Sequence, residues 1–225
     1  MGSTKRARYF YFFWQTEGVS DIHIHPKYDE TGKKEFDIAL IQLETNQELQ
    51  RNELWPICLP TSPVETESYT DTRPTVIGWG KLKKNEKESS ARILQKLTGS
   101  VISQETCNSS NPELKVTIGG TKICFQSPKG APCNGDSGGG MFMRARDDTV
   151  QLIGVCSLGP RDACMPGSTK VYTKVAHSGV LDWMRETMGV EKLNMENCGV
   201  TDPAVRISET LTDKVKCFFS KRQCY

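Results

Sequence analysis

Ser137 is the residue in this sequence most suited to covalent chemistry, because glycines surround it. It lies in the stretch 132–140 (PCNGDSGGG), with Gly135 two residues before it and three glycines directly after it. Glycine permits positive φ and leaves neighbouring amides uncovered by side chains. The hydroxyl could therefore act as a nucleophile while nearby amides bind an oxyanion. A chance Gly-Asp-Ser-Gly-Gly is expected on the order of once in several thousand such chains, which makes a bare glycine turn the weaker interpretation.

A second candidate is Asp37, an acid at the start of the apolar run 36–43 (FDIALIQL). The run predicts a strand, and a lone carboxylate that enters such a strand is a candidate for function. An acid at this position is also typical of a strand-start cap or an exposed strand edge. The context of Asp37 alone leaves both interpretations open.

Short strands are the elements expected to position these residues. Turn residues separate apolar or alternating runs, which predict strands at 19–28, 36–43, 75–80, 93–101, 122–125, 141–144, 151–155 and 170–175. Only 180–188 shows helical spacing, with its apolar residues on one face. The pattern favours an all-β barrel or sandwich. A polar linker at 61–72 is the candidate domain boundary, and 190–225 is a polar extension that contains three cysteines.

Composition narrows the possible partners and the compartment. The chain has 225 residues, 25% of them charged, and a formal net charge of +2. Its basic residues are scattered, so no nucleic-acid-binding patch is expected. Nine cysteines without Cys-x-x-Cys or Cys/His spacing indicate an oxidising compartment and no metal site. We expect no cofactor.

The first residues resemble a leader without matching one. A basic start is followed by the aromatic run 9–14, whose six residues are shorter than a signal-peptide core and far too short to span a bilayer. We interpret the run as a strand or a misassembled leader. Residues 1–4 (MGST) match a myristoylation signal poorly, and we expect no membrane partner.

Six stretches, in order along residues 19–189, resemble the trypsin/chymotrypsin-like serine proteases. They are 36–40 (FDIAL), 76–80 (VIGWG), 135–139 (GDSGG), 156–159 (CSLG), 171–175 (VYTKV) and the helix that contains Trp183. The resemblance implies a double β-barrel with a C-terminal helix, in which the first barrel is incomplete. It implies an unassigned leader at 1–18, a first-barrel remnant with linker at 19–72, a second barrel with helix at 73–189 and an extension at 190–225.

The resemblance also implies roles for individual residues. Ser137 would be the nucleophile, and the amides of Gly135 and Ser137 would stabilise the oxyanion. Asp37 would orient the catalytic histidine. Asp136 would pair with a freed N-terminus on activation. Ala131 would floor the specificity pocket, where a trypsin has an acid, and Gly159 would keep one pocket wall open.

Two parts of the family pattern are absent from the sequence. The catalytic histidine of the family stands in an Ala-Ala-His-Cys stretch before the aspartate, and the activated N-terminus reads Ile-Val-Gly-Gly; the chain contains neither. We interpret His23, His25 and His177 as exposed loop residues. The loss of one contiguous block favours truncation, and we expect the chain to be inactive as written.

Three functional hypotheses follow. The first is a secreted serine endopeptidase chain that lacks its base, whose substrate would be a polypeptide. The second is a non-catalytic secreted homologue that binds a protein ligand. The third is an incomplete gene model that yields no stable protein.

The resemblance implies the disulfides Cys107–Cys124 and Cys133–Cys164. Cys58 would bond to the extension, with Cys198 the first choice and a local Cys217–Cys224 pair beside it. Cys156 would then remain as a buried thiol in an apolar strand. Lys170 could fall near the pocket, but the alignment there is a residue short.

Overall fold

The structure is a computed structural model of the chain. It describes residues 17–30, 32–45, 56–64, 66–83, 89–114, 116–117, 120–145, 149–160, 164–193, 198 and 216–219. The aromatic run 9–14 and the side chains of Cys217 and Cys224 lie outside this part, so the predictions made for them are untested. Within the described ranges, no helix is long and apolar enough to cross a membrane.

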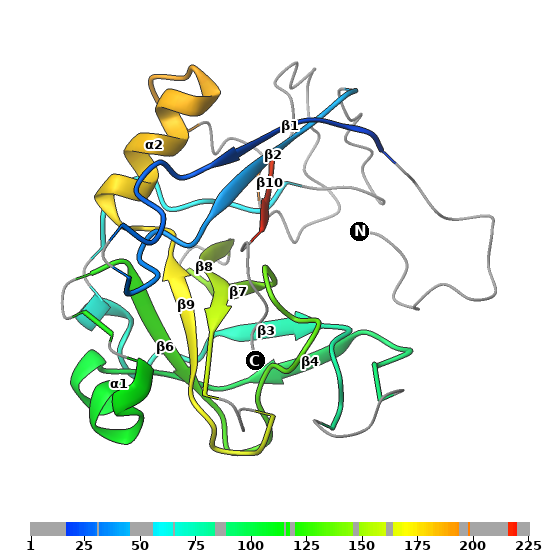
Figure 1. The fold of residues 1–225 in the computed structure, drawn as a ribbon, viewed down its shortest axis with the longest axis vertical. Coiled ribbons are helices and arrows are strands. Elements are labelled where there is room, and N and C mark those ends of the chain that lie inside the picture. Colours follow the sequence, from blue (N-terminus) through cyan, green and yellow to red (C-terminus); the bar gives the residue numbers. More distant parts are fainter. Residues whose placement is uncertain are drawn as a thin grey trace.

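A seven-stranded antiparallel sheet forms the larger part of the fold. Its order is β4-β3-β7-β8-β9-β6-β5. The strands are β3 (Thr75–Gly78), β4 (Gln95–Thr98), β5 (Ser100–Ile102), β6 (Lys122–Gln126), β7 (Gly140–Arg144), β8 (Val150–Leu158) and β9 (Lys170–Lys174). The two edge strands, β4 and β5, are consecutive and separated only by Gly99. The sheet therefore curls into a nearly closed barrel, which leaves little exposed edge (Figure 1).

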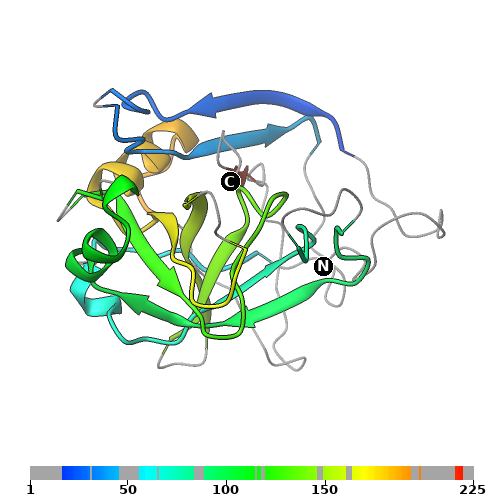
Figure 2. The same ribbon diagram turned by 60° about the horizontal axis from the view of Figure 1, so that its bottom comes forward.

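A smaller sheet lies on one side of this barrel. It has the order β1-β2-β10, formed by β1 (Val19–Ile24), β2 (Ala39–Leu43) and β10 (Lys216–Phe219). Figure 2 shows β1 and β2 running across the top of the barrel strands. The expected strand 36–43 begins later than predicted, because Phe36 adopts a φ of 51° in a turn that ends before Ala39.

Two apolar clusters hold these layers together. One fills the barrel, with residues such as Val76, Ile123 and Ile153 from facing strands. The other lies between the small sheet, the back of β8 and the C-terminal helix, and it includes Leu40 and Val155. Since β8 contributes to both clusters, it is the central strand of the molecule.

Helices are few, as predicted, but two α-helices form where one was expected. Helix α2 (Ser178–Met188) follows the predicted stripe, and it buries Val180, Leu181, Trp183 and Met184. The unexpected helix, α1 (Gln104–Ser110), is only two turns long and is capped by the Ser103 side chain. Short 3-10 turns occur at η1 (Thr66–Tyr69) and η2 (Pro112–Leu114).

The fold class is therefore all-β, with a nearly closed seven-stranded barrel, a three-stranded sheet that does not close into a barrel within the described ranges, and a C-terminal helix. The domain boundaries proposed from the sequence remain predictions.

Candidate active site

The loop that contains Ser137 owes its shape to glycines. Gly135 and Gly138 adopt φ values of 97° and 77°, which side-chain-bearing residues rarely reach. The Gly138 amide donates to the Cys156 carbonyl at 3.0 Å, and the Gly139 amide donates to the Asp136 carbonyl at 3.0 Å. These bonds fix the loop at the start of β7 and against β8. In the described part of the chain, no hydrogen bond engages the amide of Gly135.

The carboxylate of Asp136 anchors the other side of this loop. It accepts hydrogen bonds from the amides of Gly80 at 2.7 Å and Cys133 at 2.9 Å. Burial raises the pKa of Asp136, while the two amides and the charge of Lys170 oppose that rise. Asp136 is therefore held by backbone donors and by a nearby cation.

Asp37 is fully buried and lies in a hydrogen-bonded network. The Ser157 hydroxyl donates to Asp37 Oδ2 at 2.7 Å, and the Thr173 hydroxyl donates to the Asp37 carbonyl at 2.8 Å. Lys122 Nζ donates to the Ser157 hydroxyl at 2.9 Å and to the Thr173 hydroxyl at 3.3 Å. The network ties the segment before β2 to three barrel strands, β6, β8 and β9.

The two chemical candidates from the sequence meet at β8. Cys156 binds the Ser137 loop through its carbonyl, and the next residue, Ser157, binds the Asp37 carboxylate. Asp37 and the nucleophile loop are thus held by adjacent residues, although they lie far apart in the sequence. Their assignment as catalytic residues remains a prediction.

The interpretation of all three histidines as exposed loop residues is wrong. His25 is only 3% exposed. Its ring stacks on Phe36 and contacts Trp183, its Nε2 lies 3.2 Å from the Gly179 carbonyl, and its Nδ1 accepts from the Lys27 amide. Burial lowers the pKa of His25, so the ring packs as a neutral group.

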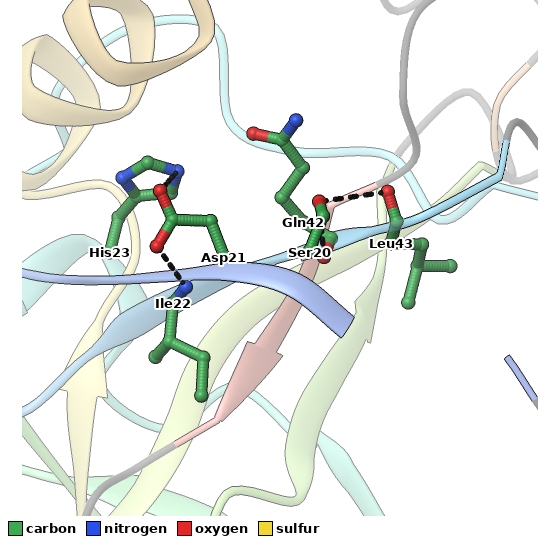
Figure 3. Close-up of polar contacts among 6 residues, drawn as sticks. All are labelled: Ser20, Asp21, Ile22, His23, Gln42 and Leu43. Atoms are coloured by element: carbon green, nitrogen blue, oxygen red, sulfur yellow. Dashed lines mark hydrogen bonds and ion pairs between the residues drawn. The ribbon is translucent and has the colours of Figure 1, made fainter. Parts of the chain in front are cut away.

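The other two histidines also have structural contacts. His177 is half-buried and caps helix α2, because its Nδ1 accepts from the Gly179 amide at 3.1 Å. Figure 3 shows the His23 ring beside the Asp21 carboxylate on β1, where Nε2 and Oδ2 are 3.5 Å apart. All three rings are thus engaged in packing, capping or pairing contacts of their own.

The two residues expected to form the specificity pocket lie in different surroundings. Ala131 lines a cavity of about 610 Å³ that also reaches Asp136 and Tyr172. Gly159 instead packs against Lys170: a Cβ at position 159 would lie 2.7 Å from Lys170 Cδ and 2.9 Å from its Nζ. The Lys170 side chain therefore occupies the space that the absent side chain of Gly159 leaves.

Lys170 is an unusual residue for that place. It is fully buried, and within the described part of the chain its Nζ has no hydrogen-bond partner. Burial lowers the pKa of Lys170 to about 8, while the charge of Asp136 opposes the shift. A buried ammonium repels a basic side chain that approaches it, which agrees with the absence of an acid at position 131.

Three disulfides are described in the structure, and one of them, Cys133–Cys164, lies beside this site. The structure contains Cys107–Cys124 and Cys133–Cys164, the pairs that the resemblance implied, and Cys58–Cys198, the first choice for Cys58. The expectation of a free thiol at Cys156 is wrong, because that sulfur is itself disulfide-bonded. The sulfur that it bonds lies outside the described side chains.

Sequence reasoning missed Ser157 and Lys122, the two side chains that connect to the Asp37 carboxylate. In the sequence, Ser157 stands out only as part of the motif 156–159, and Lys122 only as the first residue of a predicted strand. A lysine that opens the otherwise apolar run KICF is a weak signal, since lysines at strand ends are usually solvated.

Comparisons with known proteins agree with the motif order. The model of the trypsin family matches residues 14–184. Clotting factor C of Tachypleus tridentatus is 33% identical over 181 residues, which cover 76% of this chain and 17% of that protein. Human testisin is 31% identical over 187 residues, 78% of this chain and 56% of testisin. Bovine coagulation factor XI is 32% identical over 175 residues, 75% of this chain and 25% of that protein. The chain thus covers less than two thirds of each of these relatives.

Proposed function

The chain belongs to the trypsin family of serine proteases, and we propose that it carries the acyl-transfer site of a serine endopeptidase without its general base. The observation that carries the proposal is the common support of Ser137 and Asp37. The nucleophile loop bonds to Cys156, and Asp37 bonds to the adjacent Ser157. A glycine-shaped loop beside a buried carboxylate suits nucleophilic attack on a peptide carbonyl.

The proposed reaction cannot begin unless the Ser137 hydroxyl gives up its proton. A serine hydroxyl needs a neighbouring base to accept its proton as the oxygen attacks the carbonyl carbon. His25 and His177 have packing and capping contacts, and His23 pairs with Asp21 on β1. We therefore propose that the 225-residue chain is inactive as it stands, although it contains Gly135 and Ser137, whose amides are the proposed oxyanion donors.

A fluorophosphonate probe tests this proposal. Attack by an activated Ser137 would form a phosphonate ester and release fluoride, so the purified chain should show labelling below about one molecule in a hundred under conditions that fully label a trypsin. A Ser137→Ala variant gives the background. Stoichiometric labelling of Ser137, absent in that variant, would show that the chain has a functional base.

Lys170 favours a second candidate, a non-catalytic protein-binding module. Its side chain fills the space beside Gly159, where a substrate side chain would enter a protease pocket. A binding module tolerates such closure, whereas a protease needs the pocket open. The genomic sequence upstream separates the two, because an exon that encodes Ala-Ala-His-Cys would favour the enzyme.

We also propose that the chain is secreted. Four disulfide-bonded positions of the barrel domain, Cys107, Cys124, Cys133 and Cys164, support an oxidising environment. The ligand or substrate proposed for either candidate is a polypeptide.

A further inference from the structure

Lys122 is a charged residue in a place where a strand of this barrel buries apolar side chains. It opens β6, it is 1% exposed, and every residue of the run 122–125 is buried. The cost of burying an isolated ammonium is large, so a lysine here needs hydrogen-bond acceptors and compensating charges. Its surroundings supply both.

Two hydroxyl groups connect Lys122 to Asp37 by parallel routes. Through Ser157, the ammonium reaches the carboxylate in two hydrogen bonds of 2.9 and 2.7 Å. Through Thr173, it reaches the Asp37 carbonyl in two bonds of 3.3 and 2.8 Å. All four residues are at most 1% exposed, so water does not screen the pair.

The charges that face Lys122 are mainly acidic. Besides Asp37, the neighbouring groups are Glu35 and Asp29, which attract the ammonium, and Lys34, which repels it. Glu35 is itself fixed to the residue before Lys122, because its Oε2 accepts from the Thr121 amide at 2.9 Å and from the Thr121 hydroxyl. The acids come from the segment before β2, and the base comes from β6.

We propose that Lys122 is the resident counter-charge of Asp37 and that Ser157 is the positioning residue between them. In a family member with its histidine, an imidazole provides the partner of this aspartate. Here the compensating charge comes from inside the second barrel, so Asp37 can stay buried and oriented without an imidazole. The proposal rests on the proposed function only in treating Asp37 as the orienting carboxylate.

A pH titration of the lysine side chains by NMR tests the coupling directly. Burial lowers the pKa of Lys122 to about 8, and the charge of Asp37 limits that fall. Removing the negative charge with Asp37→Asn should lower the Lys122 pKa further, by about 1. Asp182→Asn is the matched control, since it removes an exposed carboxylate that pairs with Arg185, and it should leave Lys122 unchanged. A Lys122→Met sample assigns the signal.

Two Ser157 variants test whether the Ser157 hydroxyl connects Lys122 to Asp37 by hydrogen bonds or only fills space between them. Ser157→Ala should lower the Lys122 pKa, and Ser157→Thr, which keeps the hydroxyl, should restore it. These two variants also decide the matter if Asp37→Asn does not fold. An unchanged Lys122 pKa in every folded variant would overturn the proposal, because the Asp37 charge limits the fall of that pKa. Because the Lys122 titration does not depend on catalysis, its result is independent of whether the fluorophosphonate probe labels Ser137.

Discussion

Two buried lysines should make the stability of this protein rise with pH. Burial lowers the pKa of both Lys122 and Lys170 from 10.5 to about 8. Between these values the unfolded chain holds protons that the folded chain has released, so raising the pH favours folding. Below about pH 8 both states are protonated, and the full cost of burying the charges remains.

The predicted rise is about 2–3 kcal/mol of unfolding free energy for each lysine between about pH 8 and 10. Urea unfolding across this range measures it, and Lys170→Met should remove about half of the total. Lys129→Met, at an exposed site, should leave the slope unchanged. The range ends at about pH 10, because burial raises the pKa of Tyr69 to about 12 and stability then falls as unfolded tyrosine ionises. Equal slopes for wild type and Lys170→Met would contradict this explanation.

At the residue scale, the sequence predicts those features of the site that depend on the local conformation of the backbone. The loop around Ser137 could be identified because only glycine suits its positive φ values at 135 and 138. The burial of Lys122 and Lys170 could not be predicted, because nothing in a strand pattern indicates that a terminal lysine points inward. Their burial depends on partners far away in the sequence, such as Ser157 and Asp136.

At the scale of elements, the end of β3 packs closely against the Asp136 carboxylate. Two positions there, Gly78 and Gly80, have no room for a side chain. A Cβ added at Gly78 or at Gly80 would collide with that carboxylate. The Gly80 amide also donates to it, so the backbone there cannot move away without losing a hydrogen bond. The end of β3 and the nucleophile loop are therefore fitted to each other.

Gly80→Ala should lower the unfolding free energy by about 1–3 kcal/mol, the usual cost of forcing extra atoms into a packed site. Gly130→Ala is the matched control. Its Cβ would lie 3.9 Å from its nearest neighbour, Leu97, and it should change stability by no more than about 0.5 kcal/mol. Denaturant unfolding of the two variants makes the comparison. Equal effects would mean that the contact with Asp136 is not tightly packed.

The two helices show where element prediction works. Helix α2 is 11 residues long, so its apolar side repeats often enough to be recognised, and Gly189 ends it at a φ of 68°. Helix α1 has only seven residues and buries a polar one, Gln104. A helix so short cannot display a clear 3.6-residue period. Its one local signal is the Ser103 cap, which the sequence shares with many turns.

At the scale of the whole molecule, β8 and one long-range disulfide join the two halves. The backbone of Cys58 forms an isolated β-bridge with Gln151 of β8, and its sulfur forms a disulfide with Cys198, which follows helix α2 in the chain. The apolar cluster under that helix combines Leu40 of the small sheet with Val155 of β8. Within the described ranges, the small sheet is thus held by packing against the barrel and helix α2.

The Cys58–Cys198 bond should consequently stabilise the fold more than Cys107–Cys124 does. The two bonds span 140 and 17 residues, for which chain entropy gives about 5 and about 3 kcal/mol at 25 °C. Other disulfides lie inside the 140-residue loop and shorten its effective length, so the actual difference in stabilisation between the two bonds should be smaller than these values. The double variants Cys58→Ser/Cys198→Ser and Cys107→Ser/Cys124→Ser, compared by urea unfolding, measure it.

The position of each disulfide in the fold leads to the same expectation as the size of the loop that it closes. Cys107–Cys124 joins helix α1 to β6 within one barrel, whose seven strands are also held by their own hydrogen-bonded pairing. Cys58–Cys198 closes the chain across the helix that covers the small sheet, so its loss should also free that helix to separate. Hydrogen exchange at α2 amides should therefore accelerate in the first double variant and remain slow in the second. Faster exchange at α2 in the second variant would show that the barrel, and not the long-range bond, keeps this helix in place.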